Sequence, residues 1–159
     1  KAYGATETIV VDVIEKRLEL AKKLGASLVI NATKEDPVEK ILELTKGNGI
    51  DKVFETAGTE TTIKQTPYLV KRGGTIVLVG LAPKDIIEYD FMKIMVKEAT
   101  IKSVFRYRNL YPVAIEAIAK GNINVLDIVT HEFDFNDTQK AYDYITKNKN
   151  DVVKAVIKI

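Results

Sequence analysis

Asp12 and Arg17 are the residues whose types and spacing first suggest chemistry. Asp12 follows the apolar, β-branched run Ile9–Val11, which is typical of a parallel strand buried on both faces. Open α/β sheets bind ligands at the carboxyl ends of their strands, where a carboxylate accepts hydrogen bonds from both hydroxyls of an adenosine ribose and repels a 2′-phosphate. Arg17, one helical turn later, offers a planar guanidinium that can stack on an adenine ring. The pair predicts NAD rather than NADP; the alternative is that Asp12 only caps the following helix.

The elements that would position this pair alternate between strand and helix. Buried strands are expected over residues 27–31, 51–55 and 75–79, and helices over 15–24, from Asp36-Pro37 to about residue 46, and over 60–69. Short connections between them favour right-handed βαβ units. The sequence therefore predicts a doubly wound, Rossmann-type parallel α/β sheet in three αβα layers.

The second half of the chain changes pattern. We expect a short extended edge at Ile86–Tyr89, helices over 91–96, 111–120 and 137–147, and strands over 100–105, 129–133 and 152–159. The last strand alternates apolar residues with Lys154 and Lys158, so one of its faces is predicted to be wet. This strand is therefore expected to belong to a different sheet.

Composition excludes several classes of function. The 159 residues carry 24 Lys and Arg against 22 Asp and Glu, a net charge of +2, which is too small to indicate a nucleic-acid or membrane partner. No apolar run approaches the ~20 residues of a membrane span. Without cysteine, and with His131 as its one histidine, the chain has no zinc site of its own, and His131 is expected to be structural. These features fit a cytoplasmic protein that acts on a small molecule.

Two loops after predicted strands hold further candidates. Gly80 follows the strong strand Thr75–Val79, and a residue without a side chain lets backbone approach a cofactor closely; it is also compatible with a simple turn. Arg106 and Tyr107 follow the next strand and offer hydrogen-bond donors to a substrate rich in hydroxyls. They are also compatible with a solvated loop cation and a cap over the core.

The chain resembles the coenzyme half of zinc-dependent medium-chain alcohol dehydrogenases, most of all the polyol (sorbitol and xylitol) branch. The resemblance rests on Gly-Gly-Thr-Ile-Val-Leu-Val-Gly-Leu from Gly73, on Val-Phe-Arg-Tyr from Val104 and on Thr-His-Glu-Phe from Thr130. It implies NAD-dependent oxidation of a secondary hydroxyl to a ketone, in a dimer or tetramer. The implied cofactor contacts are Asp12, Arg17, Val79, Gly80, Leu81, Val104, Phe105 and Arg106, and the implied substrate contacts are Arg106 and Tyr107.

The chain departs from this family at its start. The phosphate loop G-x-G-x-x-G precedes the acidic residue by about 20 residues in such folds, but only 11 residues precede Asp12. The residues around Gly4 read as the end of a helix, so we expect a chain that begins mid-fold, without the first strand, the glycine-rich loop, the catalytic domain and its zinc ligands. The resemblance implies a coenzyme domain over 1–108 and a segment over 109–159 that returns to the absent domain.

The expected fragment has no catalytic residue and no metal ligand, and alone it should be inactive. Rival interpretations are an L-threonine or butanediol dehydrogenase, a zinc-free quinone reductase, and a non-catalytic NAD-sensing module. Self-association is expected through the Ile86–Tyr89 edge by pairing of strands between copies.

Overall fold

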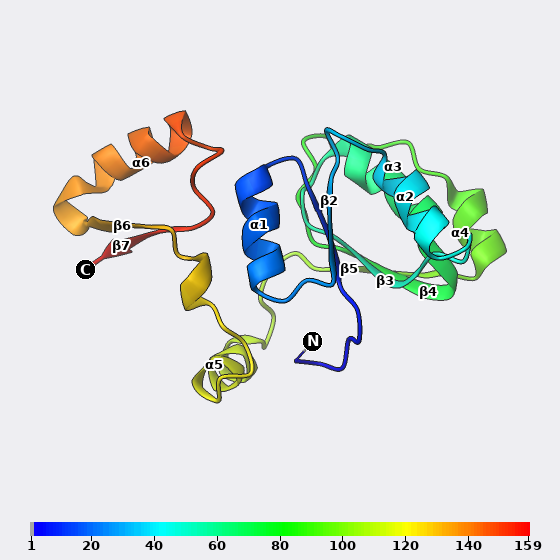
Figure 1. The fold of residues 1–159 in the computed structure, drawn as a ribbon, viewed down its shortest axis with the longest axis horizontal. Coiled ribbons are helices and arrows are strands. Elements are labelled where there is room, and N and C mark those ends of the chain that lie inside the picture. The colour runs from blue at the N-terminus through cyan, green and yellow to red at the C-terminus, as the bar shows by residue number, and fades with distance from the viewer. Residues whose placement is uncertain (1) are drawn as a thin grey trace. The chain divides into compact units, whose positions relative to one another are not determined.

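The computed structural model describes residues 2–159, which form two compact units (Figure 1). The first unit combines the residues up to Glu35 with Leu110–Ile159, and the second comprises Asp36–Asn109. The predicted division of the chain at residue 108 concerns a whole enzyme and stays a prediction.

The amino-terminal part of the first unit is a strand–helix–strand motif. Strand β1 (Ile9–Asp12) pairs in parallel with β2 (Leu28–Asn31), so that Asp12 lies opposite Asn31. Helix α1 (Glu15–Lys23) connects the strands and packs on both of them. Its Leu18 and the β2 residue Ile30 are fully buried, which is the burial that the apolar runs predict. The packing holds Asp12 at the carboxyl end of β1.

The carboxyl-terminal part of the first unit has its own parallel sheet. It contains α5 (Tyr111–Ala119), the 3-10 turn η1 (Leu126–Ile128), β6 (His131–Asp134), η2 (Phe135–Asp137), α6 (Thr138–Lys147) and β7 (Ala155–Lys158). Strand β7 pairs with β6 alone, which confirms that the last strand belongs to a different sheet. Both strands start later than predicted, because η1 precedes β6 and because the Val152 amide closes a turn onto the carbonyl of Asn148.

The second unit is built on the parallel sheet β3-β4-β5. In chain order its elements are α2 (Pro37–Leu44), β3 (Ile50–Glu55), α3 (Glu60–Leu69), β4 (Val70–Leu78), α4 (Phe91–Lys97) and β5 (Thr100–Ser103). Helix α3 packs on β3 and β4, α4 packs on β4, and α2 contacts α3, so the three helices lie together beside the sheet (Figure 1). Val70, Ile76 and Ile94 form the buried centre of this unit.

Two expectations about the strands of this unit are wrong. Strand β4 begins at Val70 rather than at Thr75, because Val70 pairs with Ile50 before a register shift. No strand forms at Ile86–Tyr89; Tyr89 instead packs against the core, and its hydroxyl lies 2.7 Å from that of Thr66. The expected pairing of strands between copies therefore lacks a strand at Ile86–Tyr89.

Two smaller expectations also differ from the structure. Strand β5 ends at Ser103 rather than at Phe105. Residues 2–4 form a turn and a bend instead of a helix end, while Lys1 lies outside the described residues.

All three sheets are parallel, and the alternation of strand and helix confirms the predicted Rossmann-type α/β fold. Within residues 2–159, β1 pairs only with β2, and β3 only with β4. No helix in the described part combines the length and the apolar character needed to cross a membrane.

Candidate functional site

The two carboxylate oxygens of Asp12 make different contacts. Oδ1 accepts hydrogen bonds from the backbone N–H groups of Val13 (2.8 Å) and Ile14 (2.9 Å). Oδ2 lies 3.7 Å from Nη1 of Arg17. The helix N-cap is Ile14, so Asp12 holds the turn before α1 and is not itself the N-cap. The structure thus brings the predicted pair together and leaves Oδ2 without a backbone donor.

A hollow of about 460 Å³ lies next to Asp12 in the first unit. It is lined by Val13, Ile14, Glu15, Lys16, Thr33 and Asn150. Hydrogen bonds from Lys34 and Asn31 lower the pKa of Glu15 on its rim. Lys16 forms an ion pair with Asp151. The hollow follows the carboxyl ends of β1 and β2, where sheets of this kind bind ligands.

The loop Val79–Leu81 follows β4 and lies directly on the turn after β3. A Cβ atom on Gly80 would lie 2.2 Å from the Gly58 nitrogen, and one on Gly58 would lie 2.5 Å from the carbonyl oxygen of Leu81. Gly58 also has a positive φ of 66°, which favours glycine. The two backbones therefore approach so closely that neither position has room for a side chain.

Glu55 is a residue of this site that the sequence analysis missed. The side chain is 4% exposed, and its Oε1 accepts hydrogen bonds from the N–H groups of Ala57 (3.0 Å) and Gly58 (2.9 Å) and from the Thr62 hydroxyl (2.7 Å). Among the described residues, buried Oε2 has no hydrogen-bond partner. The available signal was an acidic residue at the end of a predicted strand, as at Asp12, followed by a glycine three residues later.

The loop after β5 carries the remaining candidates. Val104 extends the ladder by donating its N–H to the Leu78 carbonyl at 2.9 Å. Phe105 is 73% exposed, and the Arg106 guanidinium lies 5.1 Å from the centre of its ring. Tyr107 is exposed as well. Because Leu78 and Ser103 are register partners in parallel strands, the loops after β4 and β5 share one edge of the sheet.

The structure therefore forms two groups of candidates. Asp12 and Arg17 lie together in the first unit, and Val79–Leu81 lie with Val104–Arg106 at the sheet edge of the second unit.

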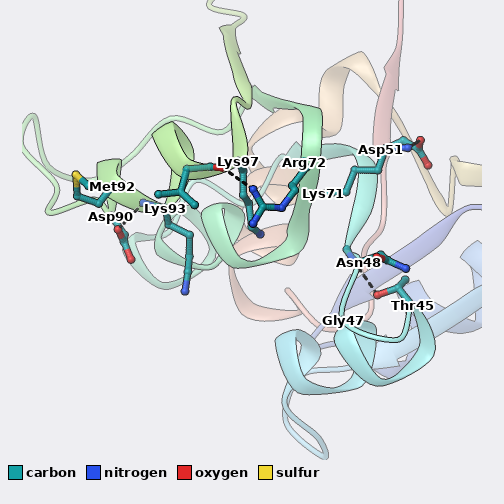
Figure 2. Close-up of a pocket in the computed structure, with 12 residues that line it drawn as sticks. Thr45, Gly47, Asn48, Asp51, Lys71, Arg72, Asp90, Met92, Lys93 and Lys97 are labelled. Atoms are coloured by element: carbon teal, nitrogen blue, oxygen red, sulfur yellow. Dashed lines mark hydrogen bonds and ion pairs between the residues drawn. The ribbon is translucent and has the colours of Figure 1, made fainter.

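A larger hollow of about 1000 Å³ lies at the other end of the second unit's sheet (Figure 2). Its lining runs from loop residues 45–49 past the starts of β3 and β4 to helix α4. Parallel α/β sheets bind ligands at the carboxyl ends of strands, and this hollow lies at the amino ends. This position argues against coenzyme binding in the hollow, although it is the larger of the two.

The cations around this hollow already have partners in the protein. Lys71 pairs with Asp51, and Arg72 donates to the Val96 carbonyl at 2.9 Å. Lys97 donates to the carbonyls of Pro67 (2.8 Å), Tyr68 (3.1 Å) and Val70 (2.5 Å). Burial, together with the charges of Lys93 and Arg72, lowers the pKa of Lys97. These contacts hold α3, β4 and α4 together.

The described residues contain no group of three His, Cys, Asp or Glu side chains able to hold a metal. His131 packs in a cluster with two aromatic rings, with ring-centre distances of 6.5 Å to Phe133 and 5.2 Å to Tyr144. Its Nε2 lies 3.4 Å from Asp151. These contacts are compatible with the structural role expected for His131, which stays a prediction.

Comparison with known proteins gives the class and then the family. The parallel α/β fold matches the coenzyme-binding domain of medium-chain dehydrogenases. The model of the zinc-binding dehydrogenase family matches residues 1–120. The chain belongs to this family, as its resemblance to zinc-dependent alcohol dehydrogenases led us to expect.

Two curated relatives illustrate the match. The chain is 52% identical, over all of its 159 residues, to the uncharacterized zinc-type alcohol dehydrogenase-like protein YdjJ of Escherichia coli, and covers 45% of that protein. It is 36% identical over 157 residues to sorbitol dehydrogenase of Bacillus subtilis, covering 99% of this chain and 44% of the relative. The chain thus spans less than half the length of these relatives.

Solved structures agree with this assignment. An Escherichia coli oxidoreductase of unknown specificity, ECK1772, matches with a TM-score of 0.91 and 51% identity over 98% of this chain and 44% of the other. The alcohol dehydrogenase rspB of Escherichia coli, solved with NADH, matches with a TM-score of 0.86 and 28% identity over 97% of this chain and 45% of its own.

Proposed function

We propose that this chain is the coenzyme-binding part of an NAD-dependent, zinc-containing dehydrogenase that oxidises a secondary hydroxyl of a polyol to a ketone. The observation that carries the proposal is Asp12 at the carboxyl end of β1, with Oδ1 held by the turn and Oδ2 free of backbone donors. A carboxylate held in this way is a preorganised acceptor for ribose hydroxyls and repels a 2′-phosphate.

The residues present fit a dinucleotide. The Gly58–Gly80 contact holds the loop after β4 against the turn after β3, so the backbone of this loop is fixed at the sheet edge where a cofactor would bind. Leu81 and Phe105, both more than 70% exposed, are large apolar side chains at the same edge, and a ligand there would cover them. NAD, when bound, supplies the hydride acceptor. In this role Asp12 and Arg17 hold the adenosine end, while Val79–Leu81 and Val104–Arg106 orient the nicotinamide end.

The substrate class rests on Arg106 and Tyr107 and on the sorbitol dehydrogenase relatives. Both side chains follow β5 on an exposed loop and offer donors that suit a substrate with several hydroxyls. A panel of sorbitol, xylitol, 2,3-butanediol and L-threonine, given to the full-length protein, tests this class. Preference for L-threonine over every polyol would contradict it.

The zinc ligands are proposed to lie outside this chain, since the described residues offer no ligand group. The chain alone is accordingly expected to turn over no polyol. Turnover by a preparation that intact mass shows to be only these 159 residues would refute this part of the proposal.

Coenzyme titrations of the full-length protein with Asp12 variants test the central assignment. Asp12→Asn keeps an oxygen for the turn but loses the charge, so NADH should bind about tenfold more weakly while the fold is retained. Asp12→Arg should lose NADH affinity and gain affinity for NADPH. The control is Asp36→Asn, which changes a carboxylate of equal size that caps α2 in the second unit. NADH affinity unchanged in both Asp12 variants would contradict the role of Asp12.

A further inference from the structure

Glu55 joins two segments that follow different strands. Its side-chain Oε1 binds the N–H groups of Ala57 and Gly58 in the turn after β3. Its backbone carbonyl accepts the N–H groups of Val79 (2.8 Å) and Gly80 (3.0 Å) in the loop after β4. One residue therefore holds both segments.

The turn after β3 and the loop after β4 meet backbone to backbone, with no side chain between them. The Glu55 carboxylate lies on the same contact, because a Cβ on Gly80 would come within 2.7 Å of Oε2. Hydrogen bonds from N–H and O–H groups to a carboxylate are roughly twice as strong as those between neutral groups. The three donors on Oε1 thus fix the side chain against the turn after β3, and Oε2 of the fixed side chain packs against Gly80 in the loop that the Glu55 carbonyl already holds.

The second carboxylate oxygen of Glu55 lies against the loop after β4. Oε2 is buried and has no partner among the described residues, and an unpaired buried acceptor lowers stability. The residue that Oε2 faces is Gly80, whose loop belongs to the proposed nicotinamide end of the site.

We propose that Glu55 is a positioning residue for the coenzyme: it sets loop 79–81 against turn 56–58, so that the loop backbone presents a fixed surface to the nicotinamide ribose. This inference rests on the proposed function. Glu55 is assigned a positioning role because its hydrogen bonds go to the turn after β3, to Thr62 on α3 and to the loop after β4. Its removal should therefore weaken coenzyme binding and raise the coenzyme KM more than it lowers kcat.

The experiment compares Glu55→Ala with Glu55→Gln in the full-length protein. NADH affinity is measured by fluorescence titration, and kcat and the coenzyme KM by steady-state kinetics. Glu55→Ala is expected to weaken NADH binding about tenfold, whereas the glutamine oxygen keeps the three donors paired and should restore affinity to within about threefold. The matched control is Glu39→Ala, an exposed carboxylate on α2, which should behave as the wild type.

A pair of milder variants, at Thr62, tests the same inference if Glu55→Ala does not fold. Thr62→Val removes the hydroxyl that donates to Oε1, and Thr62→Ser keeps it. The valine variant should weaken NADH binding about threefold and speed hydrogen exchange at the amides of Gly58 and Gly80, while the serine variant should do neither.

The outcomes separate the inference from the proposed function. A wild-type protein that binds no NADH overturns the proposed function and this inference with it. If the wild type binds NADH, the inference is overturned by a folded Glu55→Ala variant with wild-type NADH affinity, or by equal affinities of the valine and serine variants at residue 62. Loss in Glu55→Ala with restoration in Glu55→Gln supports it, as does loss in Thr62→Val alone.

Discussion

Gly80 and Gly58 meet backbone to backbone, and a Cβ added to Gly80 would lie 2.2 Å from the Gly58 nitrogen and 2.5 Å from its Cα. Gly80 is not among the glycines with positive φ, so alanine is excluded there by lack of space and not by backbone conformation. We expect Gly80→Ala to lower the free energy of unfolding by about 1–3 kcal/mol, as overpacking does. Urea denaturation and NADH titration of the full-length protein measure both effects, since a displaced loop should also bind NADH more weakly.

The control for this substitution is Gly73→Ala. Gly73 has a φ of 66° with nothing within 4 Å of an added Cβ, so alanine there should cost about 1–2 kcal/mol through backbone strain alone. NADH affinity should stay at the wild-type value. If both alanine variants weaken NADH binding equally, the loss at Gly80 reflects general destabilisation and not the contact with Gly58.

Asp36 supplies a clean test of a helix cap. Its Oδ1 accepts hydrogen bonds from the N–H groups of Val38 (2.7 Å) and Glu39 (3.0 Å) at the start of α2. Asp36→Ala should lower the free energy of unfolding by about 1 kcal/mol, whereas Asp36→Asn, which keeps the acceptor, should change it by only a few tenths of that. Equal losses in urea denaturation would show that the cap oxygen is not the source of the stability.

The contacts of the Glu60 carboxylate are expected to stabilise the fold in an acid-sensitive way. Hydrogen bonds from Lys64 and then Lys84, with their charges, lower its pKa from 4.5 to about 2. Because the pKa is lower in the folded state, this stabilisation is fully present above pH 4.5 and is lost as the pH falls from 4.5 to about 2. The stability difference between wild type and Glu60→Gln should therefore shrink across that range. A difference that stays constant from pH 6 to pH 2 would contradict the assignment, and Lys64→Met should raise the pKa of Glu60 in an NMR titration.

Lys97 is expected to be more important for stability than its position in an open hollow suggests. Its ammonium group satisfies three carbonyls at the junction of α3 and β4, and Lys97→Met leaves all three without this donor. The expected loss is about 1–3 kcal/mol in the free energy of unfolding. Lys93→Met is the control, because Lys93 only lies over the ring of Tyr68 at 4.2 Å, a contact worth about 1 kcal/mol or less at an exposed site. A smaller loss at Lys97 than at Lys93 would refute the expectation.

Local signals predicted the helices better than the strands. Helix α3 has the predicted bounds Glu60–Leu69: Thr59 caps its start, and the extended backbone of Val70 ends it. Two glycines misled the prediction of β4: Gly73 and Gly74 read as a break, yet the strand already pairs with β3 at Val70. That pairing depends on a partner 20 residues away and has no local signature.

The candidate site shows the same limit. The position of Asp12 at the end of β1 follows from the apolar run before it, and the pairing with Arg17 follows from one helical turn. The role of Glu55 depends on donors from the turn, the helix and the next loop, which meet only in the folded unit. Tyr89 likewise lies in a stretch that was expected to be an extended edge, but its hydroxyl reaches Thr66 in the core.

Strands β1 and β3 each pair on one side only within residues 2–159. An edge of this kind presents a row of N–H and C=O groups that recruits strands from other molecules. Expressed by itself, the chain should therefore aggregate as its concentration rises. Light scattering over a concentration series measures this, and a chain that stays monomeric at high concentration would contradict it.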